Sequence, residues 1–103
     1  MSIVVTGSIA FDYIMDFPGY FKDHILPDKV HVLSVSFLVE TMRKMRGGTA
    51  GNIAYNLALL GEAPRVLATV GEDFGDYRQH LAASGVDTSL IREVAGEYTA
   101  LAF

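Results

Sequence analysis

The sequence predicts an α/β fold with a mainly parallel sheet, because strand-like and helix-like segments alternate along the chain. Short β-branched runs at 3–5 and 64–70 are typical of strands that are buried on both faces. Two other segments, 50–60 and 74–82, carry apolar residues at helical spacing. Strand–helix–strand units favour parallel pairing with right-handed crossovers.

The composition is that of a globular protein and excludes several functional classes. The chain has 103 residues, of which 50% are hydrophobic and 19% charged, so it forms at most one ordinary domain. Its formal net charge of −4 disfavours nucleic acid and anionic membrane as partners. No apolar run approaches the ~18 residues of a membrane span. The lack of cysteine excludes a disulfide scaffold and is compatible with a cytoplasmic location.

The first half of the chain predicts a strand followed by an exposed excursion. The first strand, 3–5, ends at Gly7, and the N-terminus lacks the features of a signal peptide. Residues 13–17 predict a half-exposed strand, and the loosely alternating residues 30–39 predict another with one wet face. We therefore expect residues 13–45 to form a flap whose apolar face needs a ligand or a partner chain to cover it.

The second half predicts the repeating body of the fold. The helix at 50–60 is expected to be largely buried, with Gly61 as its left-handed end. A strand at 64–70 follows, and Asp73 is expected to cap a second helix that stops at Gly85. An extended segment at 86–94 and a strand at 98–103 complete the order. Because about 100 residues bury only a modest core, we interpret the chain as the first third of a larger α/β protein.

A glycine-rich turn, Gly47-Gly48, leads into the first helix and is a candidate ligand site. It lacks the lysine and hydroxyl residue of a phosphate-binding P-loop and the glycine spacing of the dinucleotide fingerprint. Its spacing alone is equally compatible with tight packing of helix against strand. Asn52 favours a ligand site, because asparagine has poor helix propensity and its amide can orient hydroxyls.

Other polar residues are weaker candidates. Asp12 lies just past the first strand, at the edge where ligands of open α/β sheets bind, although its position alone favours a solvated loop acid. On the flap, Ser36 could face a ligand and Phe37 could stack on a ring, but a plain strand explains them as well. The histidines, His24, His31 and His80, lack metal-ligand spacing, so no metal site is predicted.

These motifs together resemble the PfkB family of carbohydrate and nucleoside kinases, which includes ribokinase and adenosine kinase. The family's first signature is a glycine pair followed by an asparagine, a small residue and two spaced glycines. Every position is matched here, by Gly47-Gly48, Asn52, Ala54, Gly61 and Gly71. The Gly7-Ser8…Asp12 segment and the turn at 71–75 are also similar, so the resemblance covers essentially the whole chain.

The resemblance implies a ribokinase-like three-layer sandwich with a mainly parallel central sheet, of which residues 1–103 form the N-terminal portion, and a small β lid that includes residues 13–45. It also implies that Asp12 holds sugar hydroxyls and that Gly47-Gly48 let the sugar approach the backbone. Asn52 would bind a ribose hydroxyl, and Ser8 would line the same pocket. ATP and Mg²⁺ are the implied cofactors, with a monovalent cation as a further candidate. They would be bound mainly by a C-terminal portion that carries the catalytic aspartate, so no catalytic residue is expected in this chain, which alone should be inactive.

Within the family, the segments 5–10, 17–19 and 33–39 are most similar to bacterial adenosine kinases. This similarity implies phosphorylation of adenosine to AMP, with Ser36, Phe37 and Phe103 near the base and a homodimer contact through the lid. Two alternatives remain open at this point. One is a ribokinase-like kinase of a free sugar, and the other is a non-catalytic fragment that only binds or dimerises.

Overall fold

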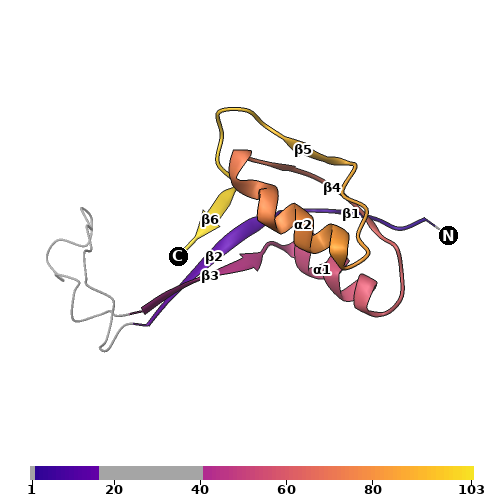
Figure 1. Ribbon diagram of the computed structural model, residues 1–103, viewed down its shortest axis with the longest axis horizontal. Coiled ribbons are helices and arrows are strands. Elements are labelled where there is room, and N and C mark those ends of the chain that lie inside the picture. Colours follow the sequence, from indigo (N-terminus) through magenta and orange to yellow (C-terminus); the bar gives the residue numbers. More distant parts are fainter. Residues whose placement is uncertain (1, 17–40) are drawn as a thin grey trace, which may run out of the picture.

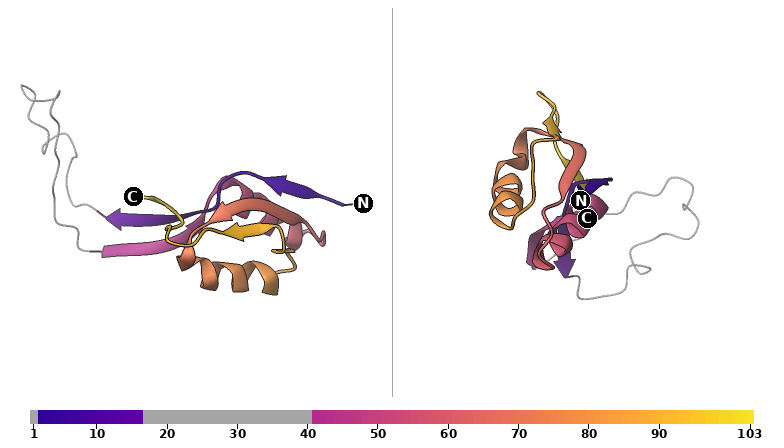
Figure 2. Two further views of the ribbon diagram at one scale, coloured as in Figure 1. Left: turned by 90° about the horizontal axis from the view of Figure 1, so that it is seen from above. Right: turned by 90° about the vertical axis from the view of Figure 1, so that its right-hand side faces the viewer.

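The computed structural model describes residues 2–16 and 41–103, which form two small sheets and two α-helices (Figure 1). The body sheet contains three parallel strands in the order β1 (Val4–Thr6), β4 (Arg65–Val70) and β5 (Ile91–Glu93). The outer sheet has the order β3 (Thr41–Gly47), β2 (Ala10–Asp16) and β6 (Ala100–Ala102). It extends away from the body, as Figure 1 and the left view of Figure 2 show.

Both helices, α1 (Thr49–Leu59) and α2 (Gly75–Ala83), cover the same face of the body sheet. The strand register places Val5 beside Val66 on this face, where both are buried. Their neighbours Val4 and Leu67 point to the opposite face and are 47% and 51% exposed. Parallel strands joined through helices confirm the α/β class, and the described residues form two of its layers.

Each α-helix ends in a glycine with a left-handed backbone, as the sequence predicts. Gly61 follows α1 with φ 92°, and Gly85 follows α2 with φ 102°. At the end of α1, the N–H of Glu62 donates to the carbonyl of Leu57 over 3.0 Å, and α2 closes in the same way. These are Schellman motifs, in which glycine lets the chain leave the helix without orphaned carbonyl groups. Within the described ranges, neither helix meets the length and hydropathy that a bilayer crossing requires.

The outer sheet differs from the predicted flap. The strand expected at 13–17 begins three residues earlier, at Ala10, and pairs antiparallel with β3 along its whole length. β3 was not predicted, because its three basic residues mask any alternation. The strand expected at 98–103 is shorter, and β6 pairs parallel with β2. The segment 30–39, with its expected strand, lies outside the described residues.

One expectation about the helices stays a prediction and one is wrong. The first helix is expected to be largely buried in a larger body; among the described residues alone, its Ile53 is 51% exposed and its Leu59 64% exposed. Its fully buried residues are small, which lets the helix lie close to the sheet, while Tyr55 and Leu57 pack partly against the core. Asp73 is not a helix cap, because a 3₁₀ turn, η3 (Glu72–Phe74), precedes α2. Its carboxylate instead accepts a hydrogen bond of 2.8 Å from the N–H of Thr99, at the entrance to β6.

Candidate functional site

Asp12 occupies the central strand of the outer sheet. The register pairs it with Met45 on one side and Ala102 on the other. Successive strand residues point to opposite faces, so Ile14 and Met45 share the face of Asp12, and towards the body this face carries the small residues Ala10, Gly47 and Ala100. The half-exposed carboxylate therefore has room for a small polar ligand on the side of these small residues.

Gly47 makes room for the Asp12 side chain. A Cβ atom at residue 47 would overlap with the carboxylate oxygen Oδ2 of Asp12. The absence of a side chain at Gly47 therefore allows the carboxylate to lie across the end of β3. The contact with Asp12 therefore explains why residue 47 is a glycine.

Gly48 is required by the packing of the chain itself. It precedes α1 with φ 91° and ψ 145°, a backbone region that is essentially restricted to glycine. A Cβ atom there would lie 2.5 Å from the carbonyl oxygen of Ser8, 2.7 Å from Cα of Ile9 and 2.8 Å from N of Ala10. The turn between β1 and β2 thus lies directly against the start of α1. Tight packing of helix against strand therefore explains why residue 48 is a glycine. The same close contact brings the start of β2 next to α1.

Ser8 completes the same junction by capping α1 from outside the helix. The N–H of Thr49 donates to Ser8 Oγ over 3.1 Å, and the N–H of Ala50 donates to the Ser8 carbonyl over 3.0 Å. The two hydroxyls of Ser8 and Thr49 lie 3.3 Å apart at the surface. Because these first N–H groups of α1 already have partners, this helix start is poorly suited to bind an anion.

Tyr77 reaches the site from α2, and sequence reasoning assigned it only to the helix core. Its hydroxyl donates a 2.8 Å hydrogen bond to the carbonyl of Gly47, and its side chain is only 2% exposed. Burial raises the pKa of Tyr77, the charge of Arg46 opposes this shift, and the charge of Asp12 adds to it. The sequence carries no local signal for this contact, because it joins residues 30 positions apart.

Asn52 lies on the exposed side of α1, one turn beyond the glycine pair. It lines a hollow of about 270 Å³ between the two helices, together with Tyr55 and His80. The structure brings Asp12, Gly47, Gly48 and Ser8 together at one junction, and Asn52 flanks that junction. Ser36 and Phe37 lie outside the described residues.

Phe103 lies on the face of the outer sheet opposite to Asp12. Its ring stacks on Tyr13 with centroids 5.1 Å apart and planes 16° apart. Tyr13 neighbours Asp12 along β2, so their side chains point to opposite faces. The expected stacking of Phe103 on a base next to the Asp12 sugar is not supported by this geometry.

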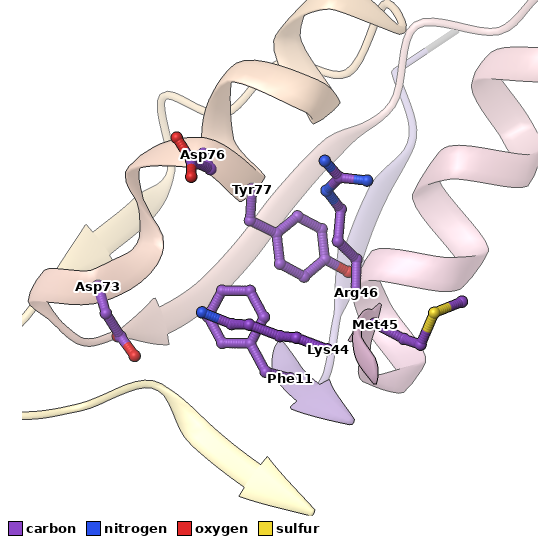
Figure 3. A pocket seen from close by; sticks show the side chains of 7 residues that line it. All are labelled: Phe11, Lys44, Met45, Arg46, Asp73, Asp76 and Tyr77. Carbon is purple, nitrogen blue, oxygen red and sulfur yellow. The ribbon is translucent and has the colours of Figure 1, made fainter. Parts of the chain in front are cut away.

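A second hollow, of about 220 Å³, separates the outer sheet from α2 (Figure 3). Lys44 and Arg46 enter it from β3, while Asp73 and Asp76 line the opposite side. The Lys44 Nζ atom lies 4.0 Å from the centre of the Phe11 ring, a cation–π contact. Across residues 2–16 and 41–103, acidic and histidine side chains do not gather into a group of three that could hold a metal ion.

Comparison with known proteins places this geometry in a family. The model of the pfkB family of carbohydrate kinases matches residues 2–103. A nucleoside kinase of Methanothermobacter thermautotrophicus is 33% identical over 103 residues, which cover 98% of this chain and 30% of that protein. The chain therefore spans about a third of the length of its relatives.

Solved structures give the same result. The nucleoside kinase of Burkholderia thailandensis in complex with inosine superposes with a TM-score of 0.78 and 40% identity, covering 97% of this chain and 31% of that one. The same enzyme has been solved in complex with ADP-inosine, with a TM-score of 0.70, 46% identity and coverage of 97% and 32%. The ribokinase of Cryptococcus neoformans shares the fold. It superposes with a TM-score of 0.74 and 23% identity, covering 97% of this chain and 29% of that one.

Proposed function

This chain belongs to the pfkB family of carbohydrate kinases, and from that premise we propose that the protein phosphorylates a nucleoside at a primary hydroxyl of its ribose. ATP would be the phosphoryl donor and adenosine the first candidate substrate. Two observations on relatives support a nucleoside: the curated relative is a nucleoside kinase, and the Burkholderia enzyme was solved with inosine. The Burkholderia complex with ADP-inosine supports an adenine nucleotide as the second ligand.

The single observation that carries the proposal is the position of Asp12. Its carboxylate lies on the central strand, over Gly47 and between Met45 and Ala102, where two adjacent sugar hydroxyls can donate to its two oxygens. Ser8, Gly48 and Asn52 would border the same substrate. A hydrogen bond to a charged acceptor contributes about 1.5–3 kcal/mol, which is enough to fix the orientation of a ribose.

The outer sheet would act as a lid over this sugar, and its exposed apolar residues would make a homodimer contact. Met42 on β3 and Leu101 on β6, which lie on the face opposite to Asp12, are 55% and 47% exposed, which supports such a contact. Ser36 and Phe37 would reach the base from this lid. Mg²⁺ and any monovalent cation would be held elsewhere in the intact protein, because the described carboxylates do not converge on one point.

The test is a kinase assay on the intact gene product with ATP and adenosine, inosine or ribose as the acceptor. We expect transfer to a nucleoside. Transfer to ribose alone would favour the free-sugar alternative, and transfer to none of the three would overturn the proposal. Asp12→Asn should weaken nucleoside binding roughly 10- to 100-fold by calorimetry, because a charged hydrogen bond contributes about 1.5–3 kcal/mol.

The matched control is Asp16→Asn. Asp16 lies on the same strand and face but accepts its hydrogen bond, of 2.7 Å, from the Thr41 hydroxyl. This variant should leave nucleoside affinity unchanged. Equal losses in the two variants would mean that the negative charge of the sheet matters and not the position of Asp12.

A further inference from the structure

We propose that Tyr77 is a positioning residue that fixes the Gly47-Gly48 turn, and with it Asp12, for substrate binding. This inference rests on the proposed function and assigns a role to a side chain on α2, outside the glycine-rich signature. Tyr77 does not need to touch the substrate. It would act through the backbone carbonyl of Gly47, to which its hydroxyl donates at 2.8 Å.

The tyrosine is held rigidly, which makes it suitable for this role. Its ring packs between Phe11 of the outer sheet and Phe74 of η3, with centroid distances of 5.7 Å and 5.2 Å. A side chain that is 2% exposed and contacts aromatic rings on two sides has few alternative rotamers. The hydroxyl therefore defines where the end of β3 lies relative to α2.

The carbonyl that Tyr77 holds belongs to the residue that accommodates Asp12. The Asp12 carboxylate fills the space that a side chain at residue 47 would occupy. A shift of the Gly47 peptide would therefore move the surface on which that carboxylate rests. Tyr77 is among the lining residues of both hollows, of about 220 and 270 Å³, and its buried hydrogen bond connects α2 to the turn next to them.

Gly51 shows that α1 is shaped around the same hydroxyl. A Cβ atom at residue 51 would overlap with the Tyr77 hydroxyl oxygen and would lie 3.1 Å from the ring carbon Cζ. Glycine is unfavourable inside a helix by about 1 kcal/mol relative to alanine, so its presence in α1 requires a packing reason. Access of the Tyr77 hydroxyl to Gly47 supplies that reason.

Tyr77 is a hydrogen-bond donor at neutral pH. A tyrosine is protonated there at its ordinary pKa of about 10, and burial raises the pKa of Tyr77 further, so the phenol can donate to the carbonyl. Phenylalanine at this position would preserve the ring packing and remove only the donor. The carbonyl of Gly47 would then lose its partner, and the turn would sample other positions.

The experiment is a double-mutant cycle in the intact gene product with Tyr77→Phe, Gly51→Ala and the double variant. We expect Tyr77→Phe to raise the KM for the nucleoside about 5- to 10-fold, because a net hydrogen bond of this kind corresponds to about that factor. The KM for ATP should change less than about two-fold. Tyr98→Phe is the control, since that side chain is 83% exposed.

Gly51→Ala should raise the nucleoside KM at least as much in the wild-type background, because the new methyl group displaces the hydroxyl. In the Tyr77→Phe background the same substitution should add less than about two-fold, since the clashing oxygen is gone. Additive effects, an unchanged nucleoside KM in Tyr77→Phe, or equal rises for nucleoside and ATP would each overturn the inference. A wild-type protein that phosphorylates neither nucleosides nor ribose overturns the proposed function and this role of Tyr77 with it. When the wild type is active on nucleosides, the variants test the role of Tyr77 alone.

Discussion

Replacing Gly48 with alanine tests whether the junction between α1 and the β1–β2 turn is as tight as the geometry indicates. Gly48 has φ 91° and ψ 145°, and a methyl group there would meet backbone atoms of residues 8–10 at 2.5–2.8 Å. Backbone atoms cannot rotate away as a side-chain end can. The substitution therefore combines backbone strain with a steric overlap.

The expected magnitude follows from these two costs. A non-glycine residue in such a backbone region costs about 1–3 kcal/mol, and overpacking a filled site costs about 1–3 kcal/mol more. Gly61→Ala is the matched control, because Gly61 has φ 92° but no atom within 4 Å of an added methyl group. Gly61→Ala should lower the free energy of unfolding only by the cost of a left-handed backbone, about 1–2 kcal/mol. The entropy that alanine removes from the unfolded chain is common to both variants and cancels.

The assay is urea unfolding of the intact gene product, followed by circular dichroism, with the nucleoside affinity measured on each folded variant. We expect Gly48→Ala to lower the free energy of unfolding by about 2 kcal/mol more than Gly61→Ala does, and to weaken nucleoside binding as well. Equal destabilisation by the two variants would refute the packing argument. Unchanged binding in Gly48→Ala would show that the junction does not position Asp12.

Two further variants test the neighbouring contacts. The Thr99 N–H lowers the pKa of Asp73 below its unfolded value of about 3.9. The charged form of Asp73 therefore stabilises the fold at pH values above that unfolded pKa. This contribution is lost as the pH falls towards the folded pKa. Asp73→Asn should therefore lower the melting temperature at pH 7 and flatten its fall below pH ~4, relative to an Asp76→Asn control; parallel melting curves would contradict this. Asn52→Ala should weaken nucleoside binding more than ATP binding, and Asn56→Ala, which removes a surface amide bonded to the Asn52 carbonyl, should change neither; equal losses for both ligands would make Asn52 purely structural.

Residues with strong local preferences were predicted well. Gly61 and Gly85 end their helices as expected, because a left-handed backbone selects glycine from local energetics alone. The strand expected at 64–70 is present as β4 (Arg65–Val70), since its β-branched run favours a strand, although only Val66 and Val70 are buried. The family itself could be identified from the spacing of the glycines and Asn52, and the comparisons confirm it.

Features that depend on contacts between distant residues were not predictable. β3 is a strand because β2 pairs with it, while Arg43, Lys44 and Arg46 hide any alternation. Asp73 has the sequence position of a helix cap, but its carboxylate accepts a hydrogen bond from the N–H of Thr99, 26 residues away. The hydrogen bond from Tyr77 to Gly47 joins residues 30 positions apart, and no local pattern announces it.

Within residues 2–16 and 41–103, the outer sheet joins the body at the end where β2 begins and β3 ends, and this gives it the mechanics of a lever. β2 follows β1 after the short turn at 7–9, and β3 enters α1 through Gly48. β6 begins next to Thr99, which is tied to Gly71 and Asp73. A seven-residue strand extends about 23 Å from these attachments, so a rotation of about 10° would move its far end by about 4 Å.

Asp12 lies only two residues from the attached end of β2, so the same rotation would move it by about 1 Å. Such a rotation would let the distal part of the sheet admit or enclose a ligand while the carboxylate stays almost stationary. Under the proposed function, binding the sugar and covering it would thus be mechanically separable in one sheet, and we expect a substitution at the far ends of β2 and β3 to change ligand exchange rates without changing the contacts of Asp12 with the sugar.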